Sequence, residues 1–251
     1  MKANFLKCKI FDKLDSTNCE AKRLALTNHP SIWILAKEQT QGRGRRGKKW
    51  HSLTKNFTAS ILLYPEIFPN QLSIYSYVAG IALYDTLLKF GIKSNQLILK
   101  WPNDLLLNNK KIGGILLESM SASLLQEKPL IIGFGVNLFS CPSSEILEDG
   151  ACPTDCLKNN LSQVPDAHLF LNILVPIFEK WNRVFLKQGF KKIRKGFLER
   201  TFPVGMKIQV KTINRSVIGN FCGLNDDGSL LIDSLAGLIN ITAGDVVLIG
   251  K

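Results

Sequence analysis

Short hydrophobic runs along the first part of the chain predict β-strands. The runs are bounded by Gly, Pro, Asn or Ser, which is typical of strands. They lie at Ile10–Leu14, Ser31–Lys37, Asn56–Leu63, Leu97–Leu107 with a break at Pro102–Asp104, Lys111–Glu118 and Pro129–Phe139. Asn108 and Asn109 separate the fourth run from the fifth, so we expect these two runs to form a hairpin.

Apolar residues at helical spacing alternate with these strands. The first helix is predicted near Thr17, because Thr17 and Glu20 fit a capping box before an apolar stripe. Further helices are predicted over Asn70–Phe90, from Asp166 to about Gln188 and over Lys191–Arg200. The pattern indicates an α+β fold, with helices packed on a mixed sheet.

The pattern changes after Pro203. Short alternating segments follow one another, with turns at Asn225–Gly228 and Ala243–Asp245. They predict a small all-β, barrel-like domain. We therefore expect a larger domain at residues 1–201 and a small β domain at residues 202–251.

The most polar stretch of the first domain follows its second predicted strand. Five cations and three glycines lie between Gly42 and Lys49. Glycine lets a ligand approach the backbone closely, and arginine offers a planar fork of donors to carboxylate and phosphate. A packed core has no use for such a segment. Its place between two strands favours an anion-binding loop over a flexible arm.

Composition narrows the class of protein. The net charge of +12 invites a nucleic-acid interpretation, but the charge is clumped in this loop and in residues 187–200. The second cluster fits a solvated helix face, with an acidic partner surface as the alternative. Apolar runs are too short to span a bilayer and no signal peptide is evident, so we expect a cytoplasmic protein without membrane contact.

Six cysteines are scattered along the chain. Cys141, Cys152 and Cys156 are close enough in sequence to suggest a metal site. Their spacing lacks the CxxC pairs of common zinc modules, and the nearest histidine is His168. The sequence therefore favours structural thiols.

The candidate functional residues are mainly of types that bind anions. No Ser-His-Asp set stands out, whereas cations recur at Lys100 and Lys111 beside Gln39, Asn103 and Asn137. Asp104 is the acid among them, and a carboxylate near phosphates commonly partners Mg²⁺. Two predicted strands each contain a pair of glycines, Gly113 and Gly114 in one and Gly133 and Gly135 in the other. They indicate either tight packing or a flat ligand lying on the sheet.

Five motifs in order resemble the signature motifs of biotin protein ligases. They are Asp15–Asn18, Gly42–Trp50, Lys100–Asp104, Lys111–Glu118 and Gly133–Leu138, and the small C-terminal β domain, SH3-like in that family, agrees too. The resemblance implies an enzyme that joins biotin and ATP, with Mg²⁺, into biotinyl-5′-adenylate. It then transfers biotin to one lysine of a carboxyl carrier protein, such as that of acetyl-CoA carboxylase.

The resemblance also assigns roles to residues. Lys111, Arg43 and Arg45 would stabilise charge during catalysis. Biotin would contact Ser16, Thr17, Asn18, Gln39, Gly42, Arg43, Gly44, Arg45, Lys111, Gly113, Gly114, Gly133 and Gly135. ATP would contact Arg43, Arg46, Lys48, Trp50, Asn103, Asp104 and Asn137, with Mg²⁺ held near Asp104 through the phosphates.

Two departures and two alternatives accompany this resemblance. Lys48 stands where many members have arginine, and only fifteen residues precede Ser16, so we expect no DNA-binding domain and no operator binding. A lipoate ligase is the nearest alternative, although its glycine-rich motif differs. A basic nucleic-acid-binding module is the alternative from another class. A monomer and a weak homodimer are equally compatible with the sequence.

Overall fold

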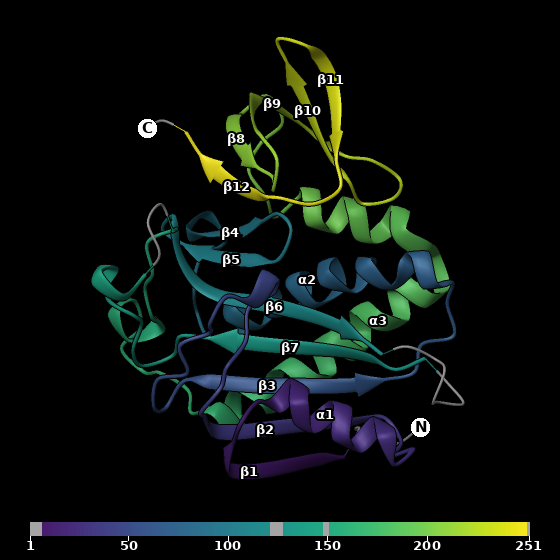
Figure 1. The fold of residues 1–251 in the computed structure, drawn as a ribbon. Helices are drawn as coiled ribbons and strands as arrows, with labels where there is room; N and C mark the ends of the chain where they lie inside the picture. The colour runs from purple at the N-terminus through teal and green to yellow at the C-terminus, as the bar shows by residue number, and fades with distance from the viewer. Residues whose placement is uncertain (1–6, 121–127, 148–150, 250–251) are drawn as a thin grey trace.

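A computed structural model describes residues 7–120, 128–147 and 151–249, which form two β-sheets and three longer helices (Figure 1). The larger sheet contains β1 (Cys8–Leu14), β2 (Ile32–Gln39), β3 (Phe57–Leu63), β4 (Leu97–Lys100), β5 (Asp104–Leu107), β6 (Lys110–Ser119) and β7 (Leu130–Val136). The helices are α1 (Thr17–Leu26), α2 (Tyr75–Lys89) and α3 (Ala167–Leu198). No helix within the described ranges is long and apolar enough to cross a membrane.

The larger sheet has the strand order β1-β2-β3-β7-β6-β5-β4. β1 pairs with β2 in parallel, and the other neighbours are antiparallel. Helices cover both faces. Trp33 and Leu35 of β2 share a core with α2 and α3, whereas Ile34 between them packs with Ala21 and Leu24 of α1. This alternation is expected of a strand whose successive side chains point to opposite faces.

The face that carries α1 is only partly covered, because α1 is short. On β7, Ile131 packs under this helix, and Gly133 and Gly135 continue the same face toward the basic loop. On β6 the same face presents Gly114 and Glu118. This glycine strip allows other side chains to approach the sheet closely beyond the end of α1.

The smaller sheet is formed by the C-terminal residues. Its strands are β8 (Lys207–Lys211), β9 (Ser216–Leu224), β10 (Leu230–Ser234), β11 (Gly237–Ile241) and β12 (Asp245–Leu248). They pair antiparallel in the order β11-β10-β9-β8-β12. The expected all-β region is confirmed, but among the described residues β11 and β12 are unpaired edges, so this is a five-stranded sheet and no closed barrel.

Three local predictions were wrong. Thr17 does not cap α1, because Ser16 is the N-cap residue and no side chain caps the helix. The helix predicted over Asn70–Phe90 starts as a 3₁₀ turn, and α2 begins only at Tyr75. Pro102–Asn103 is not a break within one strand, because Leu97 pairs with Leu107 across a complete reversal. The proline-containing turn thus creates a hairpin that precedes the expected one.

The last two predicted helices are confirmed, because α3 consists of two helices that meet at a kink at Gly189. α3 runs from Ala167 to Leu198, and Gly189 interrupts it with φ 67° and ψ −172°. Glycine reaches this conformation without a Cβ clash. The basic residues after it are not all solvated, because Arg200 lies 3.0 Å from Asp85 and Arg194 lies 2.6 Å from Asp226. The expected solvated helix face is therefore partly an ion-paired one.

Candidate functional site

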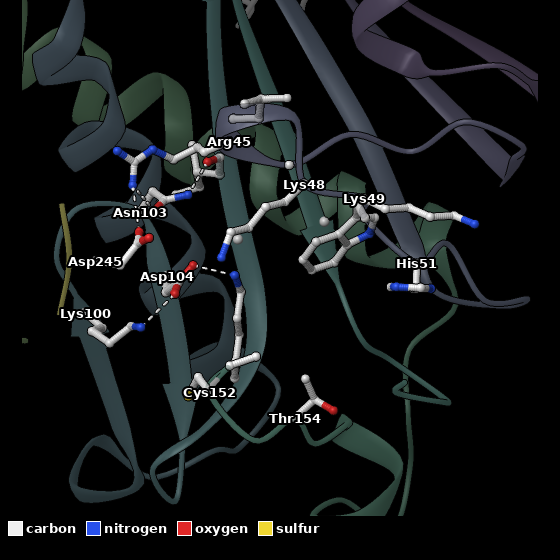
Figure 2. Close-up of a pocket in the computed structure, with 18 of the residues that line it drawn as sticks. Arg45, Lys48, Lys49, His51, Lys100, Asn103, Asp104, Cys152, Thr154 and Asp245 are labelled. Carbon is white, nitrogen blue, oxygen red and sulfur yellow. Dashed lines mark hydrogen bonds and ion pairs between the residues drawn. The ribbon is translucent and has the colours of Figure 1, made fainter. Parts of the chain in front are cut away.

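A cavity of about 790 Å³ lies on the α1 side of the larger sheet. Its walls come from the N-terminus of α1, the loop after β2, the glycine strip of β6 and β7, and strand β12 of the smaller sheet. Figure 2 shows cationic side chains from several of these elements meeting around Asp104. The cavity has a neutral end at α1 and a cationic end at β5 and β12.

The neutral end is built by hydrogen bonds between buried polar groups. Both the backbone N–H and the hydroxyl of Thr17 donate to Gln39 Oε1, at 2.8 and 3.0 Å. The amide of Gln39 then donates to Ser52 Oγ at 2.9 Å. Thr17 is fixed to β2 in this way, which explains why its hydroxyl does not cap the helix. Ser16 sits at the helix N-terminus and also lines the cavity.

Asn18 is held from two sides. Its Oδ1 accepts a hydrogen bond from Ser60 Oγ at 2.5 Å, and its Nδ2 donates to Glu118 Oε2 at 2.8 Å. Burial would raise the pKa of Glu118, but the contacts with Lys22 and Asn18 outweigh this effect and lower the pKa. Glu118 is thus an ionised acceptor that fixes the orientation of the Asn18 amide.

The glycine strip lies directly against this network. A Cβ at Gly133 would come within van der Waals overlap of Asn18 Oδ1, and a Cβ at Gly135 would overlap the Trp50 indole. A Cβ at Gly114 would lie 3.4 Å from the same indole. Trp50 therefore rests flat on the strip, and its Nε1 is buried with no hydrogen-bond partner among the described residues. Only glycine permits this close approach.

The cationic end is centred on Asp104 of β5. Its two carboxylate oxygens lie 3.0 Å from Lys100 Nζ and 2.6 Å from Lys111 Nζ. Burial alone would raise the pKa of Asp104, but the two ammonium groups outweigh it and hold the pKa at about 2. The Lys100 ammonium also donates to the carbonyl of Val246 in β12, at 3.2 Å. One carboxylate therefore orients two lysines toward the cavity.

Arg45 projects from the basic loop toward the same end. Its Nη1 lies 3.2 Å from Asn103 Oδ1 and 3.4 Å from Asp245 Oδ1 (Figure 2). Arg46 Nη1 lies 3.6 Å from the other oxygen of Asp245. Burial lowers the pKa of Arg45, and Asp245 opposes this effect. With its usual pKa far above neutral, the guanidinium remains charged and available to an anion.

Most of the predicted site residues come together around the cavity. Those that line it are Ser16, Thr17, Asn18, Gln39, Arg43, Gly44, Arg45, Arg46, Lys48, Trp50, Asn103, Asp104, Lys111, Gly114, Gly133, Gly135 and Asn137. Gly42 and Gly113 are not among the lining residues. A Cβ at Gly113 would face Leu83 of α2, on the opposite side of the sheet, and one at Gly42 would meet the carbonyl of Trp50.

Several residues of the site were missed from the sequence. Ser60 and Glu118 hold Asn18, and alternation along their strands places both on the cavity face once the strands are known. Asp245 contacts Arg45 from a position 200 residues away, and no local pattern marks it. Cys152 also lines the cavity, where burial raises the pKa of its thiol.

Comparisons with known proteins agree on one family. Residues 10–137 match the model of the biotin/lipoate A/B protein ligase family. A biotin--[acetyl-CoA-carboxylase] ligase from Paracoccus denitrificans is 38% identical over 93% of this chain and 97% of its own length. The bifunctional ligase/repressor BirA of Bacillus subtilis is 31% identical over 94% of this chain and 72% of its own length.

Solved structures agree as well. A biotin protein ligase from Aquifex aeolicus, in complex with biotin and ATP, superposes with a TM-score of 0.78. The two chains are 27% identical, and the match covers 98% of this chain and 99% of the other.

Proposed function

The chain belongs to the biotin/lipoate A/B protein ligase family, and from that premise we propose that it is a biotin protein ligase. The main support is the distribution of charge in the cavity. One end is neutral and offers hydrogen bonds, the other is cationic, and a glycine strip lies between them. Biotin has matching parts: a neutral ureido ring, a sulfur-containing apolar ring with an aliphatic tail, and a carboxylate.

The proposed reaction has two steps. In the first, a carboxylate oxygen of biotin attacks the α-phosphorus of ATP; the bond to the β-phosphate breaks and pyrophosphate leaves. In the second, the ε-amine of a carrier lysine attacks the acyl carbon of biotinyl-5′-adenylate. An amide forms, AMP leaves with the bonding electron pair, and the amine loses a proton. Neither step needs a nucleophile from the protein, so positioning and charge stabilisation supply the catalysis.

We place the ureido ring at the neutral end. Thr17, Asn18 and Gln39 offer donors and acceptors there, and Ser16 at the start of α1 extends the set. Gln39 and Asn18 already have fixed orientations through Ser52, Ser60 and Glu118. Pre-oriented groups lose little entropy on binding, which supports recognition of a small rigid ring. The apolar part of biotin would then lie beside Trp50, whose indole rests on Gly114 and Gly135.

We place the reacting groups at the cationic end. Lys111 would bind the biotin carboxylate and then stabilise charge on the acyl phosphate, and Arg43 and Arg45 would close over the α-phosphate beside Gly44. Arg46, Lys48, Asn103 and Asn137 would serve the rest of ATP. The support is electrostatic: Asp104 keeps the Lys111 ammonium aimed into the cavity, and Arg45 is largely withdrawn from solvent. Charges withdrawn from water interact more strongly with phosphate.

Magnesium does not fit Asp104 as a direct ligand. Both carboxylate oxygens of Asp104 are engaged by lysine ammonium groups, so coordination would have to break a buried ion pair. Among the described residues that line the cavity, Asp245 is the other carboxylate, and it faces Arg45 and Arg46. We propose that Asp104 acts as a counter-ion to the lysines and that any Mg²⁺ enters on the phosphates of ATP.

The acceptor is proposed to be the carboxyl carrier domain of acetyl-CoA carboxylase or a similar carboxylase. The support is the name of the Paracoccus denitrificans relative and its coverage of nearly the whole chain. Purified ligase and carrier domain, incubated with biotin and ATP, should gain one biotin on one carrier lysine, measured by intact-mass spectrometry.

ATP–pyrophosphate exchange tests the first step. Radiolabelled pyrophosphate should enter ATP when biotin is the carboxylate, and lipoate should support exchange at a far lower rate. Exchange with lipoate alone would replace biotin with lipoate as the substrate. Exchange with neither acid would refute the adenylation chemistry altogether.

A further inference from the structure

Two of the cysteines that the sequence left as structural thiols meet outside the cavity. Cys141 and Cys156 come together with Asp155, and one ligand-type atom of each residue lies within 4.8 Å of the other two. Cys152, which the sequence grouped with them, points elsewhere: its Sγ lies 3.9 Å from the carbonyl of Asn109. The cluster is therefore two thiols and one carboxylate, a donor set absent from the sequence-based grouping.

The chain on both sides of this cluster is held in place by hydrogen bonds to its backbone. On the Cys141 side, Asn56 Oδ1 accepts hydrogen bonds from the N–H groups of Leu138, Phe139 and Ser140, at 3.0 to 3.2 Å. The Asn56 amide also donates to the carbonyl of Ser140 at 2.7 Å. The segment that leads into Cys141 is thus held in place before any ion binds.

The Cys156 side is fixed to the same segment, which follows β7. The N–H of Leu157 donates to the carbonyl of Asn137 at 3.0 Å, and that of Lys158 donates to the carbonyl of Leu138 at 2.9 Å. Asp155 N–H donates to the carbonyl of Lys111 at 3.0 Å. Cys141 and Cys156, 15 positions apart in sequence, are therefore brought together because both adjoin the segment of residues 137–140.

We propose that Cys141, Asp155 and Cys156 form a zinc site with three protein ligands that is separate from the ligase chemistry. Two thiolates and one carboxylate oxygen are ligands that Zn²⁺ accepts, and water can complete a tetrahedron. In such a tetrahedron the ligand atoms lie about 3.5–4 Å apart. The three ligand atoms, within 4.8 Å of one another, would have to approach by about 1 Å to reach this geometry.

The surroundings of Asp155 suit a ligand as well. Its Oδ1 accepts from Cys156 N–H at 2.8 Å and from Asn159 Nδ2 at 2.7 Å, and its Oδ2 accepts from Asn160 Nδ2 at 3.2 Å. Ligating carboxylates are commonly oriented by such outer hydrogen bonds. Zinc binds cysteine as the thiolate, so binding displaces protons from the two thiols and should weaken as the pH falls.

The site would tie together two parts of the cavity wall. Thr154, one residue before Asp155, donates to the carbonyl of Pro142 at 2.7 Å, and both residues line the cavity. Lys111 N–H donates to the carbonyl of Pro153 at 2.7 Å. An ion held between Cys141 and Cys156 would therefore brace the segment beside Lys111 without touching the cavity itself.

Metal binding by the reduced, full-length protein tests the proposal. Chelator-treated protein is dialysed against buffered Zn²⁺, and bound metal is counted by atomic emission; Co²⁺ is used in parallel for its thiolate charge-transfer absorption. We expect about one equivalent of metal and a release of protons on binding. Cys141→Ser and Asp155→Asn should each weaken zinc binding more than about 10-fold.

Cys222→Ser is the matched control, because Cys222 lies in β9 outside the cluster and its loss should leave zinc binding unchanged. Cys141 is only half-buried and asparagine retains the acceptor of Asp155, so both variants should fold; thermal unfolding of the metal-free proteins checks this. Equal zinc binding by wild type and Cys141→Ser overturns the proposal. So does a Cys141–Cys156 disulfide that forms in air while the reduced protein takes up no zinc.

Discussion

The two ends of the cavity are organised by different forces. At the neutral end Thr17, Asn18 and Ser60 are buried, and their polar atoms are linked by hydrogen bonds of 2.5 to 3.0 Å. At the cationic end the basic loop reaches Asp245 only at 3.4 and 3.6 Å, and the Asp245 side chain is 43% exposed. The neutral end is satisfied before any ligand arrives, whereas the cationic end retains charge that an anion can neutralise.

This difference indicates that the neutral end controls recognition of biotin and that the cationic end controls the rate of the reaction. A ligand that enters this buried network must replace each hydrogen bond that it breaks, because each group left unpaired costs about 1–3 kcal/mol. Cations facing a reacting phosphate instead act where charge develops in the transition state. We therefore expect changes at the neutral end to raise the KM for biotin and changes at the cationic end to lower kcat.

Loss of Lys111 should produce the largest effect. Lys111→Ala removes the cation closest to Asp104 and leaves this buried carboxylate with Lys100 alone. Adenylation, measured as single-turnover pyrophosphate release, should slow by about a thousandfold, the cost of removing a charge-stabilising group. Lys110→Ala, at the neighbouring exposed lysine of β6, should leave the rate within about twofold. A large change in KM with kcat intact would remove the distinction between the two ends.

A methyl group on the glycine strip should affect binding more than rate. Gly133→Ala places a Cβ against Asn18 Oδ1 and must displace the amide that Ser60 and Glu118 hold. The KM for biotin should rise by about 10- to 100-fold, which corresponds to the ~1–3 kcal/mol cost of a disturbed buried polar group. Calorimetric titration with biotin alone measures the same loss without ATP.

Gly113→Ala is the control on the opposite face. Its Cβ would lie 3.2 Å from the carbonyl of Gly135 and 3.4 Å from Leu83, so it strains the core beneath α2 and avoids the cavity. Thermal stability should fall while biotin affinity stays within about threefold. Equal losses of biotin affinity in both variants would contradict the assignment of the two faces.

The pH dependence of stability should report the buried carboxylate at the cationic end. The pKa of Asp104 is about 2 in the folded protein, below the value of 3.8 expected when unfolded. Its ion pairs thus stabilise the fold fully above about pH 4, and this stability is lost as the pH falls toward 2. The contribution is about 2 kcal/mol. Urea unfolding at about pH 5 and pH 3 should show a smaller difference for Asp104→Asn than for wild type.

The sequence predicted most of the larger sheet because burial controls its strands. β3 and β7 are buried along their whole length and β2 over its first five residues, and most of these buried positions are apolar or glycine. The turn at Pro102–Asn103 was misread, because a short run on each side of a proline looks like one interrupted strand. The pairing of Leu97 with Leu107 is a long-range result that local pattern does not specify.

The site residues likewise fall into those that the sequence predicted and those that depend on the three-dimensional fold. The basic loop, Lys111 and the glycine strip stand in contiguous motifs, so sequence alone assembled them. The motifs did not tell which face of the sheet each residue points to. Gly113 and Gly114 are adjacent, yet a Cβ on Gly113 would face α2 and a Cβ on Gly114 would face the cavity. Asp245 comes from the smaller sheet, and its place beside Arg45 depends on how that sheet packs.

The smallest expected effect belongs to Asp245, and it tests how loosely the cationic end is held. Its ion pairs with Arg45 and Arg46 are long and half-exposed, and such pairs contribute about 0–1 kcal/mol. Asp245→Asn should therefore change the KM for ATP by at most about fivefold and leave the KM for biotin unchanged, as measured by pyrophosphate exchange. Asp233→Asn, on β10 of the same sheet, serves as the control for lost negative charge. A drop in kcat as large as that of Lys111→Ala would show that Asp245 organises the cationic end as firmly as Ser60 and Glu118 organise the neutral one.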